Sequence, residues 1–153
     1  MLKTTVYINS SNSLEIIQRN LDVISSLYYT GYKEWLKNKF IPSYKNGNSS
    51  IITAHDKTYN TLVGFALLKH NEEENKLCNL SPLLDGVGVT QLLLESVDFV
   101  LPNDYYIDVP VNEKANKLTD KLVSNGYESI EQNYSKDNTL QTRLYRPRNI
   151  QWI

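Results

Sequence analysis

The chain has 153 residues, a length that fits one domain with a buried core. Apolar residues make up 41% and charged residues 22%, which is the composition of a folded globular protein. The net charge of −1 gives no reason to expect nucleic acid or an anionic membrane as the partner. No apolar run approaches the roughly 20 residues that cross a bilayer, and the single cysteine, Cys78, fits a reducing compartment. We therefore expect a cytoplasmic protein in which residues 1–153 form one domain.

The first third of the chain predicts one strand and two helices. Residues 4–8, TTVYI, are rich in strand-forming side chains. Asn12 and Glu15 have the spacing of a capping box, and apolar residues follow at helical intervals, so a helix is expected over 13 to about 28. A second helix is expected over 32–40, and Pro42 should end it.

The rest of the chain alternates strands and helices. Strands are expected at 50–54, 61–70, 76–81, 105–111, 127–134 and 140–146, and helices at about 87–100 and at 112–126, the second capped by Asn112. The strand–helix–strand unit in the middle implies a parallel pair, whereas the hairpins imply antiparallel ones. The last strand is expected at an edge of the sheet. The predicted fold class is therefore α/β, with a mixed sheet and helices on both of its faces.

Two of the six glycines, Gly86 and Gly88, lie directly before the helix expected at 87–100. The first turn of a helix has unpaired N–H groups and a partial positive charge, and glycine lets a phosphate approach such a backbone closely. On spacing alone, however, glycines before a helix are more often ordinary turn residues. The third glycine of a Rossmann loop and the Gly-Lys-Ser/Thr of a Walker loop are absent from the sequence.

The surrounding sequence resembles the GCN5-related N-acetyltransferase (GNAT) superfamily. The resemblance lies in LVGFALLKHNEEENKLCNLSPLLDGVGVTQLLLESV (62–97), in VPVNEKANKL (109–118) and in NGY (125–127). It implies an acyl-CoA N-acyltransferase fold whose fourth and fifth strands splay apart, with acetyl-CoA as cosubstrate. The pantetheine arm of the cofactor would then lie along an exposed edge of strand 76–81.

The same resemblance implies a set of cofactor-binding residues, which comprises Asn79, Leu80, Ser81, Gly86, Val87, Gly88, Val89, Thr90 and Asn112. The loop departs from the superfamily pattern, which begins with Arg or Gln three residues before the first glycine. One register places Leu83 at that position and another places Asp85 there, so neither supplies the expected side chain. The backbone amides would have to form most of the phosphate cradle.

The catalytic candidates are Glu131 as the base, and Tyr127 and Tyr134 as acids for the leaving thiolate. In the superfamily this acid is often a tyrosine on the helix after the fifth strand, and Thr119 occupies the nearest aligned position here. A backbone N–H at Leu80 or Ser81 would stabilise the oxyanion. The alternatives are ordinary ones: half-buried tyrosines that pack against the sheet and a solvated strand carboxylate.

The sequence thus predicts an N-acetyltransferase that moves an acetyl group from acetyl-CoA directly to a primary amine. The alternative is a catalytically degenerate protein of the same fold that binds CoA or another protein. The acceptor is left open between a small molecule and a peptide, and the oligomeric state is open too, with a homodimer among the options. Neither His55 nor His70 has the spacing of a metal site, so no metal is expected.

Overall fold

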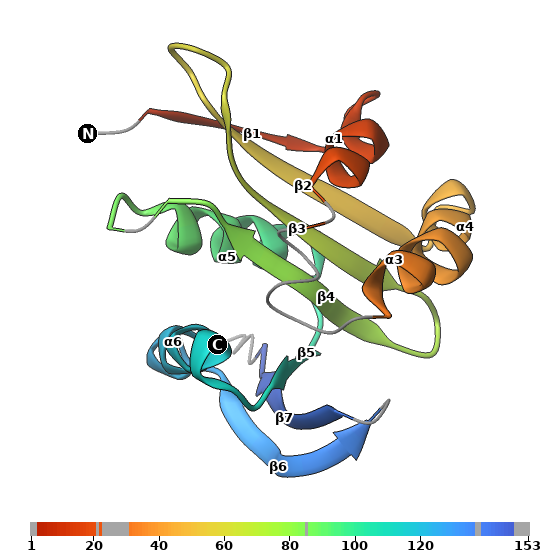
Figure 1. Ribbon diagram of the computed structural model, residues 1–153, viewed down its shortest axis with the longest axis vertical. Coiled ribbons are helices and arrows are strands. Elements are labelled where there is room, and N and C mark those ends of the chain that lie inside the picture. The colour runs from red at the N-terminus through yellow and green to blue at the C-terminus, as the bar shows by residue number, and fades with distance from the viewer. Residues whose placement is uncertain (1–2, 21, 23–30, 85, 137–138, 149–153) are drawn as a thin grey trace, which may run out of the picture.

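The computed structural model describes residues 3–20, 22, 31–84, 86–136 and 139–148, and of residues 114, 130–136 and 139 it describes the backbone alone. Seven strands form one sheet in the order β1-β2-β3-β4-β5-β7-β6 (Figure 1). The strands are β1 (Thr4–Ile8), β2 (Ser49–Asp56), β3 (Leu62–His70), β4 (Asn75–Pro82), β5 (Tyr105–Pro110), β6 (Glu128–Lys136) and β7 (Thr139–Arg146). β4 and β5 pair in parallel, and every other pair is antiparallel. The mixed sheet predicted from the sequence is confirmed.

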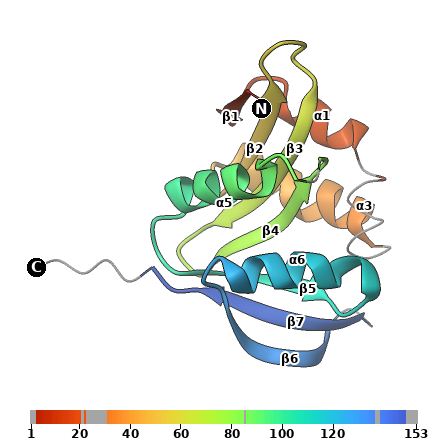
Figure 2. The ribbon, with the colours of Figure 1, turned by 90° about the vertical axis from the view of Figure 1, so that its left-hand side faces the viewer.

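Helices cover both faces of this sheet, which confirms the predicted fold class (Figures 1 and 2). The described helices are α1 (Ser13–Arg19), α3 (Tyr32–Trp35), the π-helical turn η1 (Leu36–Phe40), α4 (Ile41–Lys45), α5 (Val89–Val100) and α6 (Glu113–Ser124). The helices from α1 to α4 lie on one face, and α5 and α6 lie on the other. Each face has its own apolar core. One is built around Ile17, Tyr32, Phe40, Phe65 and Leu67, and the other around Leu80, Leu93, Val97, Ile107 and Val109.

β4 and β5 pair over only a very short length. Their pairing is confined to Lys76 and Tyr106, after which the two strands diverge (Figure 1). The cause lies in β4: Leu77 is opposite Leu68 of β3 but Asn79 is opposite Leu67, so Cys78 is an extra residue on the β4 side. An extra residue of this kind is a β-bulge, which bends its strand and increases the local twist. The predicted splaying of the fourth and fifth strands is therefore present.

Three predictions for the N-terminal helices are wrong. α1 ends at Arg19, because the side chain of Asn20 donates to the carbonyl of Ile16 at 2.7 Å and closes the last turn. The continuation expected to about residue 28 falls mostly outside the described residues. Asn12 does not cap α1 with its side chain, since its Oδ1 accepts from Ser10 Oγ at 3.0 Å instead. Pro42 does not end the second helix but lies in the first turn of α4, where a residue without an N–H is tolerated.

The sequence predicted that the C-terminal strand lies at an edge of the sheet, and this prediction is wrong. β7 lies between β5 and β6, and β6 forms the edge. On one side β7 pairs with β6, from Glu128 opposite Tyr145 to Lys136 opposite Thr139, and on the other side it pairs with β5, from Tyr105 opposite Arg146 to Pro110 opposite Gln141. The β5–β7–β6 group therefore forms a three-stranded unit whose strand pairing with β1–β4, within the described residues, is confined to Lys76 and Tyr106.

Candidate cofactor and acyl-transfer site

A surface pocket of about 220 Å³ lies at the N-terminus of α5. It contains four of the residues predicted to bind a cofactor, Gly86, Gly88, Val89 and Thr90. The fifth residue of that loop, Val87, is about half exposed beside them. The sequence motif and the pocket therefore coincide, and the structure brings this part of the predicted site together.

The glycine loop has the backbone geometry that a close ligand needs. Gly86 and Gly88 have φ of 73° and 84°, in the left-handed region that glycine adopts most readily, and a Cβ at either would meet nothing within 4 Å. Gly88 is the N-cap of α5 and carries no side chain that could bond to the first turn. The first turn of this 12-residue helix therefore presents its amide groups and its partial positive charge to the pocket.

Two further pocket residues come from α6 and its end: Lys121 and Asn125. Lys121 places a cation beside the loop, which matters because neither register of the loop motif supplied one. The side chain of Asn125 donates to the carbonyl of Lys121 at 2.7 Å, and this bond fixes the C-terminal turn of α6 against the pocket. Sequence reasoning missed both residues. The sequence signal that could have found them is that Lys121 and Asn125 are four residues apart, a spacing that puts two side chains on one face of a helix.

The edge of β4 that should receive the pantetheine arm is covered. Asn79, Leu80 and Ser81 have no exposed surface, where the sequence analysis expects an exposed edge. The cover is apolar packing: Leu80 belongs to the same core cluster as Val109 of β5 and Ala115 of α6, which lie across the divergence. Binding of an extended arm at this edge would therefore have to displace side chains.

Asn112 and Thr119 both use their polar groups within α6. The Asn112 Oδ1 accepts from the N–H of Ala115 at 2.8 Å, so the predicted cap is confirmed. Thr119 Oγ1 donates to the carbonyl of Ala115 at 3.3 Å. A hydroxyl that is bonded to its own helix in this way is not presented to a leaving thiolate.

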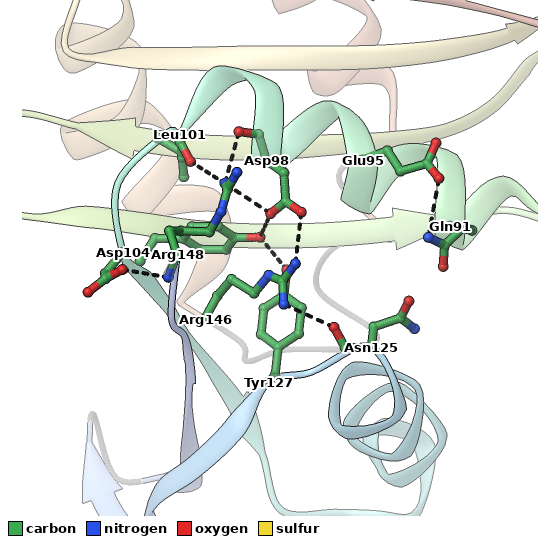
Figure 3. Close-up of polar contacts among 10 residues, drawn as sticks. Gln91, Glu95, Asp98, Leu101, Asp104, Asn125, Tyr127, Arg146 and Arg148 are labelled. Atoms are coloured by element: carbon green, nitrogen blue, oxygen red, sulfur yellow. Dashed lines mark hydrogen bonds and ion pairs between the residues drawn. The ribbon is translucent and has the colours of Figure 1, made fainter. Parts of the chain in front are cut away.

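Tyr127 lies in a buried polar cluster at the far end of α5 (Figure 3). Its hydroxyl is hydrogen-bonded to that of Tyr105, which in turn donates to Asp98 Oδ1 at 2.8 Å. Arg146 and Arg148 reach the same carboxylate at 3.2 and 3.3 Å, so Asp98 anchors the end of β7 to α5. Burial is the largest cause that raises the pKa of Tyr127 to about 12. These contacts explain Tyr127 as a structural residue and give no support to its predicted catalytic role.

Glu131 and Tyr134 are described only as backbone. Their Cα partners on β7 are Arg143 and Gln141, and β6 has irregular register at both points. Their side chains lie outside the described part of the structure, so their predicted catalytic roles stay predictions. Asp85, which one register of the loop motif places at the position of the expected Arg or Gln, lies outside it as well.

Charged side chains gather where β4 last pairs with β5. Asp108 of β5 is bound through two oxygens by Arg143, at 2.8 and 3.2 Å, and lies 3.4 Å from Lys76 Nζ. The hydroxyl of Tyr106 donates to Glu74, and the guanidinium of Arg143 stacks 4.2 Å from the Tyr106 ring centroid. This cluster joins β4, β5 and β7 at the point where the sheet divides.

The arrangement of strands and helices is shared with known acetyltransferases. A GNAT-family acetyltransferase from Staphylococcus aureus Mu50 matches with a TM-score of 0.69 and 15% identity, over 95% of this chain and 100% of that one. The ribosomal-protein-S18-alanine N-acetyltransferase of Escherichia coli gives a TM-score of 0.68 at 11% identity, over 98% and 97%. The PaiA N-acetyltransferase of Thermoplasma acidophilum, in complex with coenzyme A, gives 0.61 at 15%, over 91% and 98%.

The chain has the GNAT fold. The superfamily resemblance drawn from residues 62–127 is thereby confirmed at the level of the fold. No protein-family model and no curated protein sequence matches the chain. Among the described residues, no helix has the length and apolar character needed to cross a membrane, and no group of three or more His, Cys, Asp or Glu side chains could hold a metal ion.

Proposed function

We propose that this chain is an N-acetyltransferase that uses acetyl-CoA and transfers the acetyl group directly to a primary amine. The observation that carries the proposal is the pocket at the N-terminus of α5, with its two open glycines and Lys121, next to the strand that leaves its parallel neighbour after one residue pair. Amide groups, a helix N-terminus and a lysine are together the chemistry that binds a pyrophosphate.

In this reaction the amine nitrogen forms a bond to the acyl carbon, the carbon–sulfur bond breaks, and the thiolate leaves and takes up a proton. The chain would hold the diphosphate in the α5 pocket through the amides of the glycine loop and Lys121. The N–H groups of Leu80 and Ser81 remain our candidates for stabilising the oxyanion, and Glu131 and Tyr134 our candidates for moving protons. The apolar cover of β4 would exclude water from the thioester.

Two observations favour the alternative, a protein that keeps the fold but does not catalyse. The cover over Asn79, Leu80 and Ser81 closes the edge of β4, and Thr119 stands in place of a tyrosine with its hydroxyl bonded to α6. Such a protein would bind CoA at the α5 pocket and release no thiol.

The test is calorimetric titration of the chain with CoA, followed by thiol release from acetyl-CoA over a panel of primary amines. Lys121→Gln removes the pocket cation and should weaken CoA binding by about tenfold to a hundredfold, the range of one hydrogen bond to a charged group. Lys117→Gln is the matched control, because it makes the same charge change one turn away on α6 at an exposed residue that does not line the pocket.

Three outcomes separate the possibilities. Binding that depends on Lys121, together with thiol release, supports the enzyme. Binding without thiol release for any amine supports the non-catalytic protein. An absence of CoA binding at millimolar concentration, or an equal loss in both lysine variants, contradicts the α5 pocket as a cofactor site.

A further inference from the structure

Asn79 on β4 carries a buried hydrogen-bond donor without a partner. The residue has no exposed surface, and its Nδ2 makes no hydrogen bond within the described structure. The other end of the carboxamide is engaged, because Oδ1 accepts from Ser81 Oγ at 2.6 Å. Buried donors are satisfied almost without exception, since an unmet one loses its hydrogen bonds to water and gains nothing. The Asn79 Nδ2 donor is therefore available to a group that arrives from outside the chain.

The position of this donor in the sheet indicates what it would meet. Asn79 is opposite Leu67 and Ser81 is opposite Phe65, and residues opposite one another on antiparallel strands share a face. Leu67 and Phe65 belong to the core beneath α1 and α3, so Asn79 lies on that face and not beneath α5. The α5 pocket, where the cofactor would enter, is on the opposite face. Asn79 is thus placed for the second substrate, directly after the Cys78 bulge and three residues after Lys76, the last residue of β4 that pairs with β5.

The charges on the same face argue against a polycationic substrate. Glu74 is paired with Lys69 at 3.2 Å and accepts from Tyr106, and Asp108 is held by Arg143 and Lys76. Both carboxylates that flank this part of the described sheet therefore already have cationic partners. A polyamine would have to displace a lysine or an arginine to find a counter-ion.

The chemistry of the donor narrows the ligand further. A fully buried amide N–H needs an acceptor atom that gives up water cheaply, which favours an uncharged carbonyl oxygen over a carboxylate. The nitrogen lone pair of the attacking amine cannot serve, because it forms the new bond to the acyl carbon. A simple alkylamine has no other acceptor, whereas an α-amino amide has a carbonyl oxygen three bonds from its amine nitrogen.

We propose that Asn79 selects the acceptor by donating from Nδ2 to a carbonyl oxygen beside the reactive amine, so that the substrates are α-amino amides, the chemistry of a peptide N-terminus. This inference rests on the proposed acetyltransferase function and names the substrate class of that site. Ser81 is a positioning residue in this scheme, because its hydroxyl holds Oδ1 and thereby sets the direction of Nδ2.

The experiment compares kcat/KM for two pairs of acceptors in the full chain: alaninamide against butylamine, and the tripeptide Ala-Ala-Ala against spermidine. Asn79→Leu removes the donor at nearly constant volume, and Asn79→Asp removes it while keeping an oxygen for Ser81. Each variant should lower the alaninamide-to-butylamine ratio of kcat/KM by about tenfold to a hundredfold, because one hydrogen bond to the substrate is lost. Comparison of kcat/KM for alaninamide and for Ala-Ala-Ala then shows whether the carbonyl belongs to a free amino-acid amide or to a peptide chain.

Thr53→Val is the matched control. Thr53 Oγ1 is another buried polar atom without a hydrogen bond, and Thr53 lies on β2 opposite Phe65. Thr53→Val therefore removes a buried polar atom of the same kind without changing a residue of β4. We expect Thr53→Val to leave the acceptor ratio unchanged and to melt no lower than the parent chain by circular dichroism.

The inference is overturned if the ratio is unchanged in both Asn79 variants, if kcat/KM falls equally for both amines, or if the parent chain prefers spermidine. In each of these cases the proposed function stands, because transfer is still observed. An absence of transfer to every amine with CoA still bound contradicts the catalytic function, and the inference about Asn79 falls with it.

Discussion

Gly64 of β3 lies close beneath the first turns of α5, and its replacement should disturb the candidate site. A Cβ at this position would lie 2.8 Å from Val89 Cγ1, 3.0 Å from Leu93 Cδ1 and 3.3 Å from the carbonyl oxygen of Ser81. The first two atoms belong to the first turns of α5 and the third to β4. Gly64→Ala must therefore push the N-terminus of α5 away from the sheet or shift β4.

The expected cost is moderate. Overpacking by a methyl group in a closely packed region destabilises by about 1–3 kcal/mol. Alanine regains about 0.5–1 kcal/mol of the backbone entropy that glycine loses in a strand. The net loss for Gly64→Ala should therefore be about 1–2 kcal/mol, and CoA binding should weaken as well, because the displaced helix turn forms the α5 pocket.

A double-mutant cycle on urea unfolding identifies the cause. Val89→Ala removes the nearest atom, so Gly64→Ala should be less harmful in its presence, by about 1 kcal/mol of coupling. Gly47 provides the comparison: its φ is +80° and a Cβ there meets nothing within 4 Å, so Gly47→Ala should destabilise through backbone strain that Val89→Ala cannot relieve. Additive effects of Gly64→Ala and Val89→Ala would refute the packing argument.

Two further predictions concern stability. Asn112→Ala should destabilise the fold by about 0.5–2 kcal/mol in urea unfolding, because it removes a formed helix cap, whereas Asn12→Ala should have little effect, because its side chain bonds to no helix amide; equal losses would contradict this assignment. Burial alone would raise the pKa of Glu74, but hydrogen bonds from Tyr106 and Lys69 outweigh it and lower the pKa below 4.5. The stability that Glu74 contributes is therefore complete above pH 4.5 and is lost as the pH falls through the pKa of Glu74 in the folded state. Glu74→Gln should therefore make the free energy of unfolding fall less steeply with decreasing pH in the acid range. An unchanged dependence on pH would contradict this prediction.

The order of elements could be predicted because each strand and helix after residue 49 carries its own local pattern. The failures are concentrated where local patterns compete with tertiary contacts. Pro42 predicts a helix end by its own chemistry, but a turn of π-helix precedes it and the chain resumes as α4. Asn12 has the residue type and spacing of a cap, and the nearby hydroxyl of Ser10 takes its side chain instead. Neither outcome can be read from spacing alone.

The candidate site shows the same division. The glycines of the loop were visible in the sequence because their chemistry is local to the turn they make. Lys121 was not, because it lines the pocket from α6, more than 30 residues after the loop in the sequence. A motif scan that expects its cation three residues before the glycine has no means of finding one on another helix.

The largest effect on the site comes from a single residue that no sequence pattern singled out, the extra residue at Cys78. Leu77 lies on the α5 side of the sheet, so strict alternation along β4 would put Asn79 on that side too and Leu80 on the other. The bulge reverses this order: Leu80 fills the core under α5, and Asn79 and Ser81 face the core under α1 and α3. The same bulge follows the last residue that pairs with β5. One inserted residue thus opens the sheet on one side and turns an amide toward the other, which are the two requirements for a site that takes its substrates from opposite faces.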